Sequence, residues 1–131
     1  MRIMEFTSLT AAKDILDMLS LEFKIKPCIV KHHRCLDNKA YAKYQTRKIV
    51  FSMYSTTWKP EDMLIHEFAH ILSFDRHGKK GRGHNNFFKL ALIDVITAYY
   101  NDIEKYDWTL EYVSIKKWYS KMKGDFKHGI E

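Results

Sequence analysis

Residues 65–70 read Ile-His-Glu-Phe-Ala-His, which places two histidines four positions apart in a segment of helix-forming residues. On an α-helix such positions lie one above the other, so His66 and His70 can direct two imidazoles at one metal ion. Glu67 lies about 100° further round the helix. Its carboxylate is therefore kept away from the metal but near a metal-bound water, where a general base is needed. The motif predicts a zinc site.

The elements around this motif are predicted by hydrophobic spacing and turn residues. In chain order they are a helix over about 8–23, strands over 28–32, 40–44 and 48–54, a helix over about 60–74, a loop over 75–83, a helix over about 85–100 and a last helix over about 107–123. Pro60 suits the first position of the helix that carries the motif, because its missing N–H would be unpaired there. The two histidines then lie in the middle of that helix.

The strand over 48–54 has apolar residues at alternate positions, with Ile49, Phe51 and Met53 on one face. This pattern suits a sheet that helices cover on one side. The short connection to the preceding strand favours an antiparallel meander. The expected fold class is therefore α+β, a small antiparallel sheet of about three strands packed against helices.

A third protein ligand is needed for a catalytic zinc ion, with the fourth position left for water. His84, at the start of the helix over about 85–100, is the best candidate. The metzincin spacing would require Gly at position 73 and His at position 76. The chain has Ser73 and Arg76 instead, and His77 is one position out of register.

Asp94 is the nearest acidic residue on the helix that follows His84. It shares a helical stripe with Phe87 and Ala91, so its carboxylate is expected to face the interior and to need a partner. We predict that Asp94 accepts a hydrogen bond from the N–H of a zinc-bound histidine. Two alternatives are a plain structural hydrogen bond and direct ligation of the metal.

Residues 83–87 read Gly-His-Asn-Asn-Phe and follow a basic, glycine-containing loop. Together with the motif at 66–70, they resemble the SprT-like zinc metalloprotease family, which includes Spartan, and the resemblance covers about 49–100. That family has a third zinc-binding His in a Gly-His-Gly-x-x-Phe context; this chain has Asn85 at the second Gly and no cysteine-rich zinc ribbon. The resemblance implies a zincin-like core with the motif on a central helix, one catalytic Zn²⁺ and proteolysis of DNA-associated proteins.

The expected reaction is peptide hydrolysis by a water that zinc acidifies to a pKa of about 7, with Glu67 taking the proton and returning it to the leaving amine. Tyr99 and Tyr100 are weak candidates for a second donor to the oxyanion, and a packing role is favoured for each. The substrate is expected to lie extended along a free edge of the strand over 49–54.

A formal net charge of +6 favours contact with polyanions. The residues considered for nucleic-acid binding are Lys79, Lys80 and Arg82 in the loop, and Lys116, Lys117 and Lys121 in the last helix. The plain interpretation of that helix is a buried side made of Tyr112, Ile115 and Trp118 or Tyr119, with the lysines in solvent. The alternative is a surface whose aromatics stack on bases and whose lysines contact phosphates. Residues after 123 are expected to fray.

The length of 131 residues and the apolar content of 46% predict one domain over 1–131, with its core at about 8–101. Cys28 and Cys35 are too few for a disulfide framework and are expected to be reduced. No apolar run is long enough to span a membrane, so a soluble, cytoplasmic protein is expected.

The expected partner of the protein is a protein or peptide substrate. The alternative is a non-catalytic domain in which zinc braces a basic nucleic-acid-binding or assembly surface.

Overall fold

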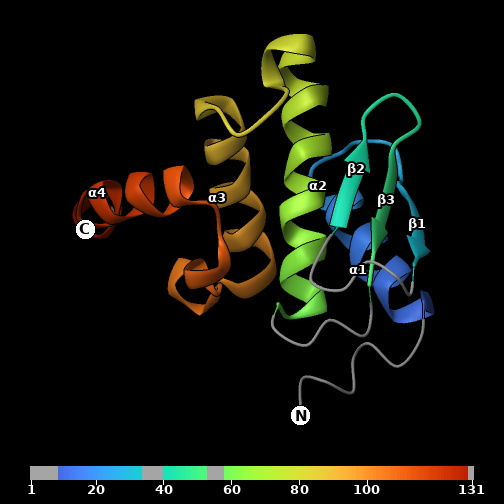
Figure 1. The fold of residues 1–131 in the computed structure, drawn as a ribbon, viewed down its shortest axis with the longest axis horizontal. Helices are drawn as coiled ribbons and strands as arrows, with labels where there is room; N and C mark the ends of the chain where they lie inside the picture. The colour runs from blue at the N-terminus through green and yellow to red at the C-terminus, as the bar shows by residue number, and fades with distance from the viewer. Residues whose placement is uncertain (1–8, 34–39, 53–57, 130–131) are drawn as a thin grey trace.

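The computed structural model describes residues 9–33, 40–52 and 58–129, with residues 124–129 described by their backbone alone. Its elements are α1 (Leu9–Glu22), β1 (Ile29–His32), β2 (Ala40–Lys43), β3 (Lys48–Phe51), α2 (Pro60–His77), η2 (Gly78–Gly81), α3 (Asn86–Tyr100), η3 (Ile103–Lys105), η4 (Trp108–Leu110) and α4 (Val113–Gly129). Figure 1 shows α2 at the centre, with the sheet on one side and α3 on the other. The predicted α+β class is confirmed.

The central helix α2 is the most enclosed element of the described structure. Pro60 is at its N-terminus, as predicted, and every residue from Glu61 to Ser73 is buried. The sheet and α1 cover one side of α2, while α3 covers another, so even the polar residues of the motif are inside the protein. A helix enclosed on all sides holds its side chains in fixed positions, which suits a site that depends on geometry.

The sheet is mixed, which corrects the predicted antiparallel meander. Its order is β1-β3-β2, with β3 parallel to β1 and antiparallel to β2. β3 is therefore the central strand and has no free edge, so the predicted substrate position along it is also wrong. The physical reason is that Ile49, Val50 and Phe51 are all buried, and a strand that is apolar on both faces is best placed between two others.

The edge strand nearest the motif is β2, which lies alongside α2 (Figure 1). The outward face of the sheet is formed by exposed residues that alternate along the two edge strands, among them Lys31, Tyr41 and Lys43. Among the described residues, no strand pairs with the outer edge of β2, the strand edge beside the central helix. Met53 and Tyr54, the last residues of the predicted strand, lie outside the described residues.

The helix α2 is longer than predicted, because it continues to His77 and is followed directly by η2 instead of by an open loop. Arg47 donates to both carboxylate oxygens of Asp75, at 2.7 and 2.9 Å, and so holds the added turn against the β2–β3 connection. The helix ends at Gly78, whose φ of 62° lies in the left-handed region that favours glycine.

The last helix, α4, runs on to Gly129, so the fraying predicted after residue 123 is wrong for residues 124–129, while residues 130 and 131 lie outside the described residues. One internal Gly at position 124 costs a helix only about 1 kcal/mol, which does not end it. Ile115 and Tyr119 are buried as predicted, and the Tyr119 ring stacks on Trp108 with centroids 3.9 Å apart. Tyr112 was also predicted to be buried but is 57% exposed, since it precedes the helix.

No helix in the described part of the chain is both long enough and apolar enough to cross a membrane. Cys28 is buried as a free thiol, and burial raises its pKa to about 11. A thiol with so high a pKa remains protonated and unreactive at neutral pH. Cys35 lies outside the described residues.

Candidate metal centre

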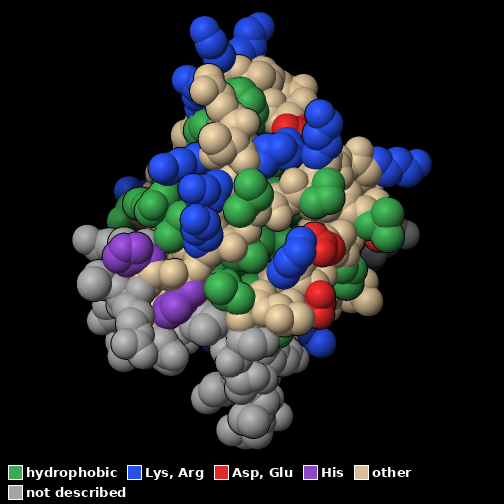
Figure 2. Space-filling view, turned by 90° about the vertical axis from the view of Figure 1, so that its right-hand side faces the viewer, with side chains coloured by type: hydrophobic (Ala, Val, Ile, Leu, Met, Phe, Trp, Pro, Cys, Tyr) green, Lys and Arg blue, Asp and Glu red, His purple; other side chains and the backbone are tan. Residues whose placement is uncertain are grey.

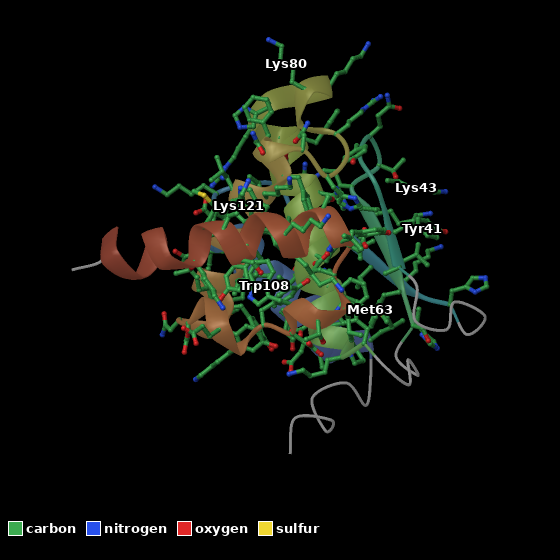
Figure 3. The ribbon with its side chains drawn as sticks, turned by 60° about the vertical axis from the view of Figure 1, so that its left-hand side comes forward. Tyr41, Lys43, Met63, Lys80, Trp108 and Lys121 are labelled. Carbon is green, nitrogen blue, oxygen red and sulfur yellow. The ribbon has the colours of Figure 1, made fainter. Side chains whose placement is uncertain are left out.

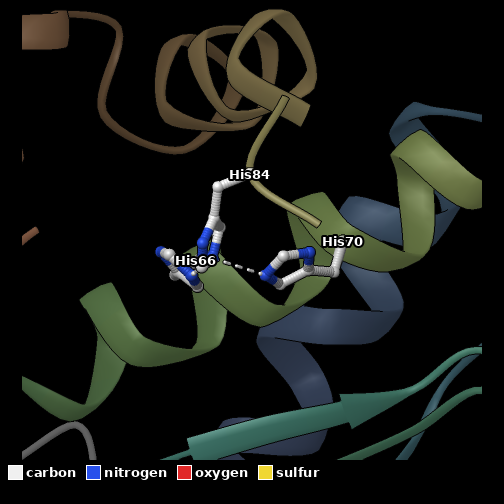
Figure 4. Close-up of side chains that lie close together, drawn as sticks. All are labelled: His66, His70 and His84. Atoms are coloured by element: carbon white, nitrogen blue, oxygen red, sulfur yellow. Dashed lines mark hydrogen bonds between the residues drawn. The ribbon is translucent and has the colours of Figure 1, made fainter. Parts of the chain in front are cut away.

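The three predicted metal ligands are brought together by the fold, from the middle of α2 and from the residue just before the cap of α3 (Figure 4). His84 Nε2 lies 3.2 Å from His66 Nε2 and 3.1 Å from His70 Nε2. Around a tetrahedral ion with metal–nitrogen bonds of about 2.0–2.1 Å, neighbouring nitrogens lie about 3.3–3.4 Å apart. The spacing of the three nitrogens therefore suits one metal ion.

Hydrogen bonds between the rings do not account for this arrangement. Two short nitrogen contacts meet at Nε2 of His84, and that atom carries either one proton or one lone pair. It can form a linear bond with only one of the two neighbours. A cation held by three lone pairs satisfies all three rings at once, so the donor set itself favours a metal.

The charges of the histidines suit this role. Burial, together with the neighbouring His66 and His84, lowers the pKa of His70 to about 2. Burial also lowers the pKa of His84, again with a contribution from His66. Both rings are therefore neutral at neutral pH and can offer a lone pair to a metal ion.

The ring of His66 is oriented by Glu111, a residue that no sequence pattern singled out. Glu111 Oε2 lies 2.6 Å from His66 Nδ1, and both side chains are buried. Tyr106 donates a hydrogen bond to the same carboxylate oxygen, and the backbone N–H of Tyr112 donates to Oε1. The carboxylate fixes the proton of His66 on Nδ1, which leaves Nε2 free for the metal.

The pKa values of this pair reflect two opposing effects. Burial lowers the pKa of His66, but the hydrogen bond that His66 donates to Glu111 and the charges of Glu67 and Glu111 outweigh it and raise the value. Burial raises the pKa of Glu111, but the hydrogen bond and charge of His66 outweigh it and lower the value. Glu111 is therefore an anion that accepts from His66.

Asp94 does not have the supporting role that was predicted for it. Its side chain is 47% exposed and pairs with Arg76 at 2.8 Å. Of the residues on its stripe, Ala91 is buried but Phe87 is 39% exposed, so Asp94 lies at the solvent border of α3 and not in its interior. Phe88 and Leu92, which lie on the neighbouring stripe one position further along the helix, are fully buried.

His70 is supported from the edge strand by Tyr44, a second residue that the sequence did not single out. The Tyr44 hydroxyl lies 3.4 Å from His70 Nδ1 and accepts a hydrogen bond from the backbone N–H of Gly83 at 3.3 Å. The Tyr44 ring stacks on Phe74, with centroids 5.0 Å apart. One side chain thus links the end of β2 to a ligand on α2 and to the residue before His84.

Glu67 is buried next to the ligand His66 and is 6% exposed. Burial raises the pKa of its carboxyl to about 7, with His66 lowering the value and Glu111 raising it. A carboxyl that titrates near neutral pH is suited to taking and returning a proton under ordinary conditions. The predicted base is therefore in an environment that fits the role.

Tyr99 and Tyr100 have structural roles, as was favoured for them, and are not oxyanion donors. Tyr99 donates its hydroxyl to Glu61 at 2.7 Å, and Tyr100 donates to Asp62. Both bonds are made in the first turn of α2, before the motif begins. The exposed aromatic residue at the centre is Tyr112, whose ring centroid lies 4.3 Å from that of His84.

The position of His84 depends on a close contact between η2 and α2. A methyl group added at Gly81 would lie 2.2 Å from the carbonyl oxygen of Ser73, so only glycine allows this approach. The Ser73 hydroxyl donates to the Gly81 carbonyl at 2.9 Å. Asn85 then caps α3 and donates its side-chain amide to the carbonyl of Lys80 at 2.7 Å. These contacts hold both ends of the segment that carries His84.

Replacing Gly81 with Ala is expected to weaken Zn²⁺ binding at least about tenfold, because the backbone must move away from Ser73 and carry His84 with it. A chelator-competition titration measures the affinity. Lys79→Ala, in the same short helix but exposed, is the matched control and should bind as the parent does. Equal affinity of Gly81→Ala and the parent would contradict this account of how His84 is positioned.

The basic residues considered for nucleic-acid binding belong to two separate sets. Lys79 and Lys80 lie in η2 and Arg82 follows it, whereas Lys116 and Lys121 lie on α4. Figure 3 shows Lys80 at one end of the molecule and Lys121 on the helix that extends from its side. A shallow groove of about 430 Å³ on α4 is lined by Val113, Lys116, Lys117, Ser120 and Lys121.

Comparisons with protein-family models, with curated proteins and with solved structures found no match to this chain. The resemblance to the SprT-like family therefore stays a prediction. Function is therefore inferred from the chemistry of the candidate metal centre alone.

Proposed function

We propose that the protein is a zinc-dependent endopeptidase of the SprT-like type, with a zincin-like core and a single catalytic Zn²⁺. The observation that carries the proposal is the convergence of His66, His70 and His84 beside the buried carboxylate of Glu67. Three imidazoles leave one coordination position open, and a structural zinc site usually fills all four with protein ligands. The free, buried Cys28 thiol supports a cytoplasmic location.

Zinc at such a site supplies an acidified water and an electrophile for a carbonyl oxygen. The protein provides the remaining parts of the reaction. Glu67 takes the proton from the attacking water and returns it to the leaving amine. Glu111 keeps the His66 ring in one tautomer and orientation, and Tyr44 does the same for the His70 ring.

The substrate is proposed to bind as an extended peptide along the free edge of β2. This edge lies beside α2 (Figure 1). Tyr44 follows directly after its last residue, and its hydroxyl lies 3.4 Å from His70 Nδ1. Main-chain hydrogen bonds to an edge strand hold a peptide without regard to sequence. Trp58, whose ring centroid lies 5.5 Å from that of His66, and the exposed Tyr112 form the aromatic walls of the centre.

The test combines metal analysis with an unbiased peptide-cleavage screen. The expected result is one zinc ion per chain and cleavage that stops on chelation and returns when Zn²⁺ is added back. Stoichiometric zinc without cleavage of any peptide would favour the non-catalytic alternative, in which the metal braces a domain that binds other molecules.

A second candidate activity is binding of DNA, which would bring the peptidase to DNA-associated proteins. The groove on α4 favours it, because three lysines line the groove without an acidic residue among them. A Lys116→Gln, Lys117→Gln, Lys121→Gln variant is expected to lose at least about tenfold in affinity for a DNA duplex, and parent binding should weaken steeply with salt. Fluorescence anisotropy at several salt concentrations measures both effects. Binding that is insensitive to salt, or equal in the variant, would exclude this surface.

A further inference from the structure

A pocket of about 340 Å³ opens beside the metal centre, at the end of the edge strand β2. Its lining consists of Lys43, Tyr44, Gln45, Thr46 and Arg82. Two of these side chains are cations, three offer a neutral hydroxyl or amide, and none is acidic. This composition is suited to holding an anionic group.

The two cations of the pocket are free to bind a ligand. Lys43 and Arg82 are exposed, and within the described residues neither has an ion-pair partner. Arg47, close by in the β2–β3 connection, is by contrast neutralised by Asp75 at 2.7 Å. Figure 2 shows that Lys and Arg side chains gather on this face of the molecule, while acidic side chains are few. An anion is therefore drawn to the pocket by charge that no protein group cancels.

The position of Arg82 is favoured by aromatic rings. Its guanidinium carbon lies 5.6 Å from the ring centroid of Tyr44 and 5.5 Å from that of Phe74. Attraction to the ring faces favours this position without using the hydrogen-bond donors of the guanidinium. Arg82 can therefore present its N–H groups to a carboxylate.

The pocket and the metal centre share a wall, Tyr44. Its ring is on the pocket side, and its hydroxyl lies 3.4 Å from Nδ1 of the ligand His70. Lys43 is the last residue of β2, and in Figure 3 its side chain points away from the sheet. The pocket and the metal centre are thus separated by about the length of one tyrosine side chain. This length corresponds to about two residues of extended peptide at about 3.3 Å per residue. A peptide on the β2 edge would thus place a side chain in the pocket about two residues from the bond at the metal centre.

We propose that this pocket is a specificity subsite that selects an acidic side chain, Asp or Glu, of the peptide substrate. The inference rests on the proposed peptidase function, which it deepens by naming a substrate class. The carboxylate pairs with Arg82 and Lys43, while Gln45 and Thr46 supply further donors. Substrates with glutamate about two residues from the cleaved bond are preferred, and the same peptides with glutamine or lysine there are disfavoured.

The test uses host peptides in which Glu, Gln or Lys is moved one position at a time along an extended sequence. For the parent, kcat/KM is expected to be about tenfold higher for the Glu peptide than for the Gln peptide, and at one position only. Two partly exposed charge-assisted contacts would give a difference of this size. A Lys43→Gln, Arg82→Gln variant should lose this preference, and a Lys43→Glu, Arg82→Glu variant should prefer lysine. The control is Lys31→Gln, Lys105→Gln, which removes the same charge from two exposed residues that do not line the pocket and should keep the preference.

A binding measurement separates failure of the subsite from failure of the peptidase function. Zinc-loaded Glu67→Gln protein is titrated calorimetrically with the Glu and Gln peptides, and tighter binding of the Glu peptide is expected without any cleavage. Cleavage by the parent with no preference at any position would overturn the subsite and leave the peptidase function standing. Binding preference in a parent that cleaves nothing would keep an anion site and overturn the peptidase function. A preference that survives in Lys43→Gln, Arg82→Gln, or a stronger preference for phosphoserine than for Glu, would overturn the assignment of this pocket to carboxylates.

Discussion

Glu67→Gln is expected to lower kcat for peptide cleavage by about a thousandfold while leaving the zinc content at one ion per chain. Glutamine has the size of glutamate but cannot accept a proton from water. The residue is buried beside the ligand His66, and burial raises the pKa of its carboxyl to about 7, so this carboxyl is poised to exchange a proton at neutral pH. Single-turnover cleavage and atomic emission on the same samples give the rate and the metal content.

The control for this variant is Glu22→Gln, which makes the same chemical change at an exposed position at the end of α1. It should cleave at the parent rate. A Glu67→Gln rate within threefold of the parent would show that another group takes the proton. Loss of zinc together with activity would show that Glu67 holds the metal centre together.

Glu111→Ala is expected to weaken Zn²⁺ binding by about 10- to 100-fold and to lower the free energy of unfolding of the metal-free protein by about 3 kcal/mol. The substitution removes the acceptor of the His66 Nδ1 proton and of the Tyr106 hydroxyl, and leaves both donors buried. The His66 ring is then free to change tautomer and to turn. Chelator competition measures the affinity, and urea denaturation with chelator present measures the stability.

Asp94→Asn is the informative control, because that acidic residue was the one predicted to support a ligand. Its side chain is 47% exposed and pairs with Arg76, so the variant should bind Zn²⁺ within twofold of the parent. Tyr106→Phe removes only one of the three hydrogen bonds that Glu111 accepts and should cost about 1 kcal/mol. Equal loss of metal affinity in Asp94→Asn and Glu111→Ala would contradict the support described for His66.

Features set by local sequence were the predictable ones. The spacing of His66 and His70 requires only that a helix forms, and Pro60 together with the apolar residues around the motif is enough to predict that helix. His84 could be placed because it directly precedes a strongly apolar segment that predicts a helix, and Asn85 proves to be the cap of that helix. Two of the three ligands thus follow from one helix, and the third from the start of the next.

Features set by tertiary contact could not be predicted. Glu111 lies 45 positions from His66, and Tyr44 lies 26 positions from His70, and no spacing rule connects residues that far apart. Asp94 was misplaced because two neighbouring stripes of α3 are both rich in apolar residues, and only the packing decides which one is buried. The order of the strands depends in the same way on which strand is covered from both sides.

The most direct test of the account is X-ray absorption at the zinc edge on the zinc-loaded protein. The account predicts one zinc ion per chain bound by three imidazole nitrogens at about 2.0–2.1 Å and one oxygen at a similar distance. His84→Ala should lose one of the imidazoles or the zinc itself. A first shell that contains sulfur at about 2.3 Å, or four protein ligands with no position for water, would contradict a catalytic centre at His66, His70 and His84.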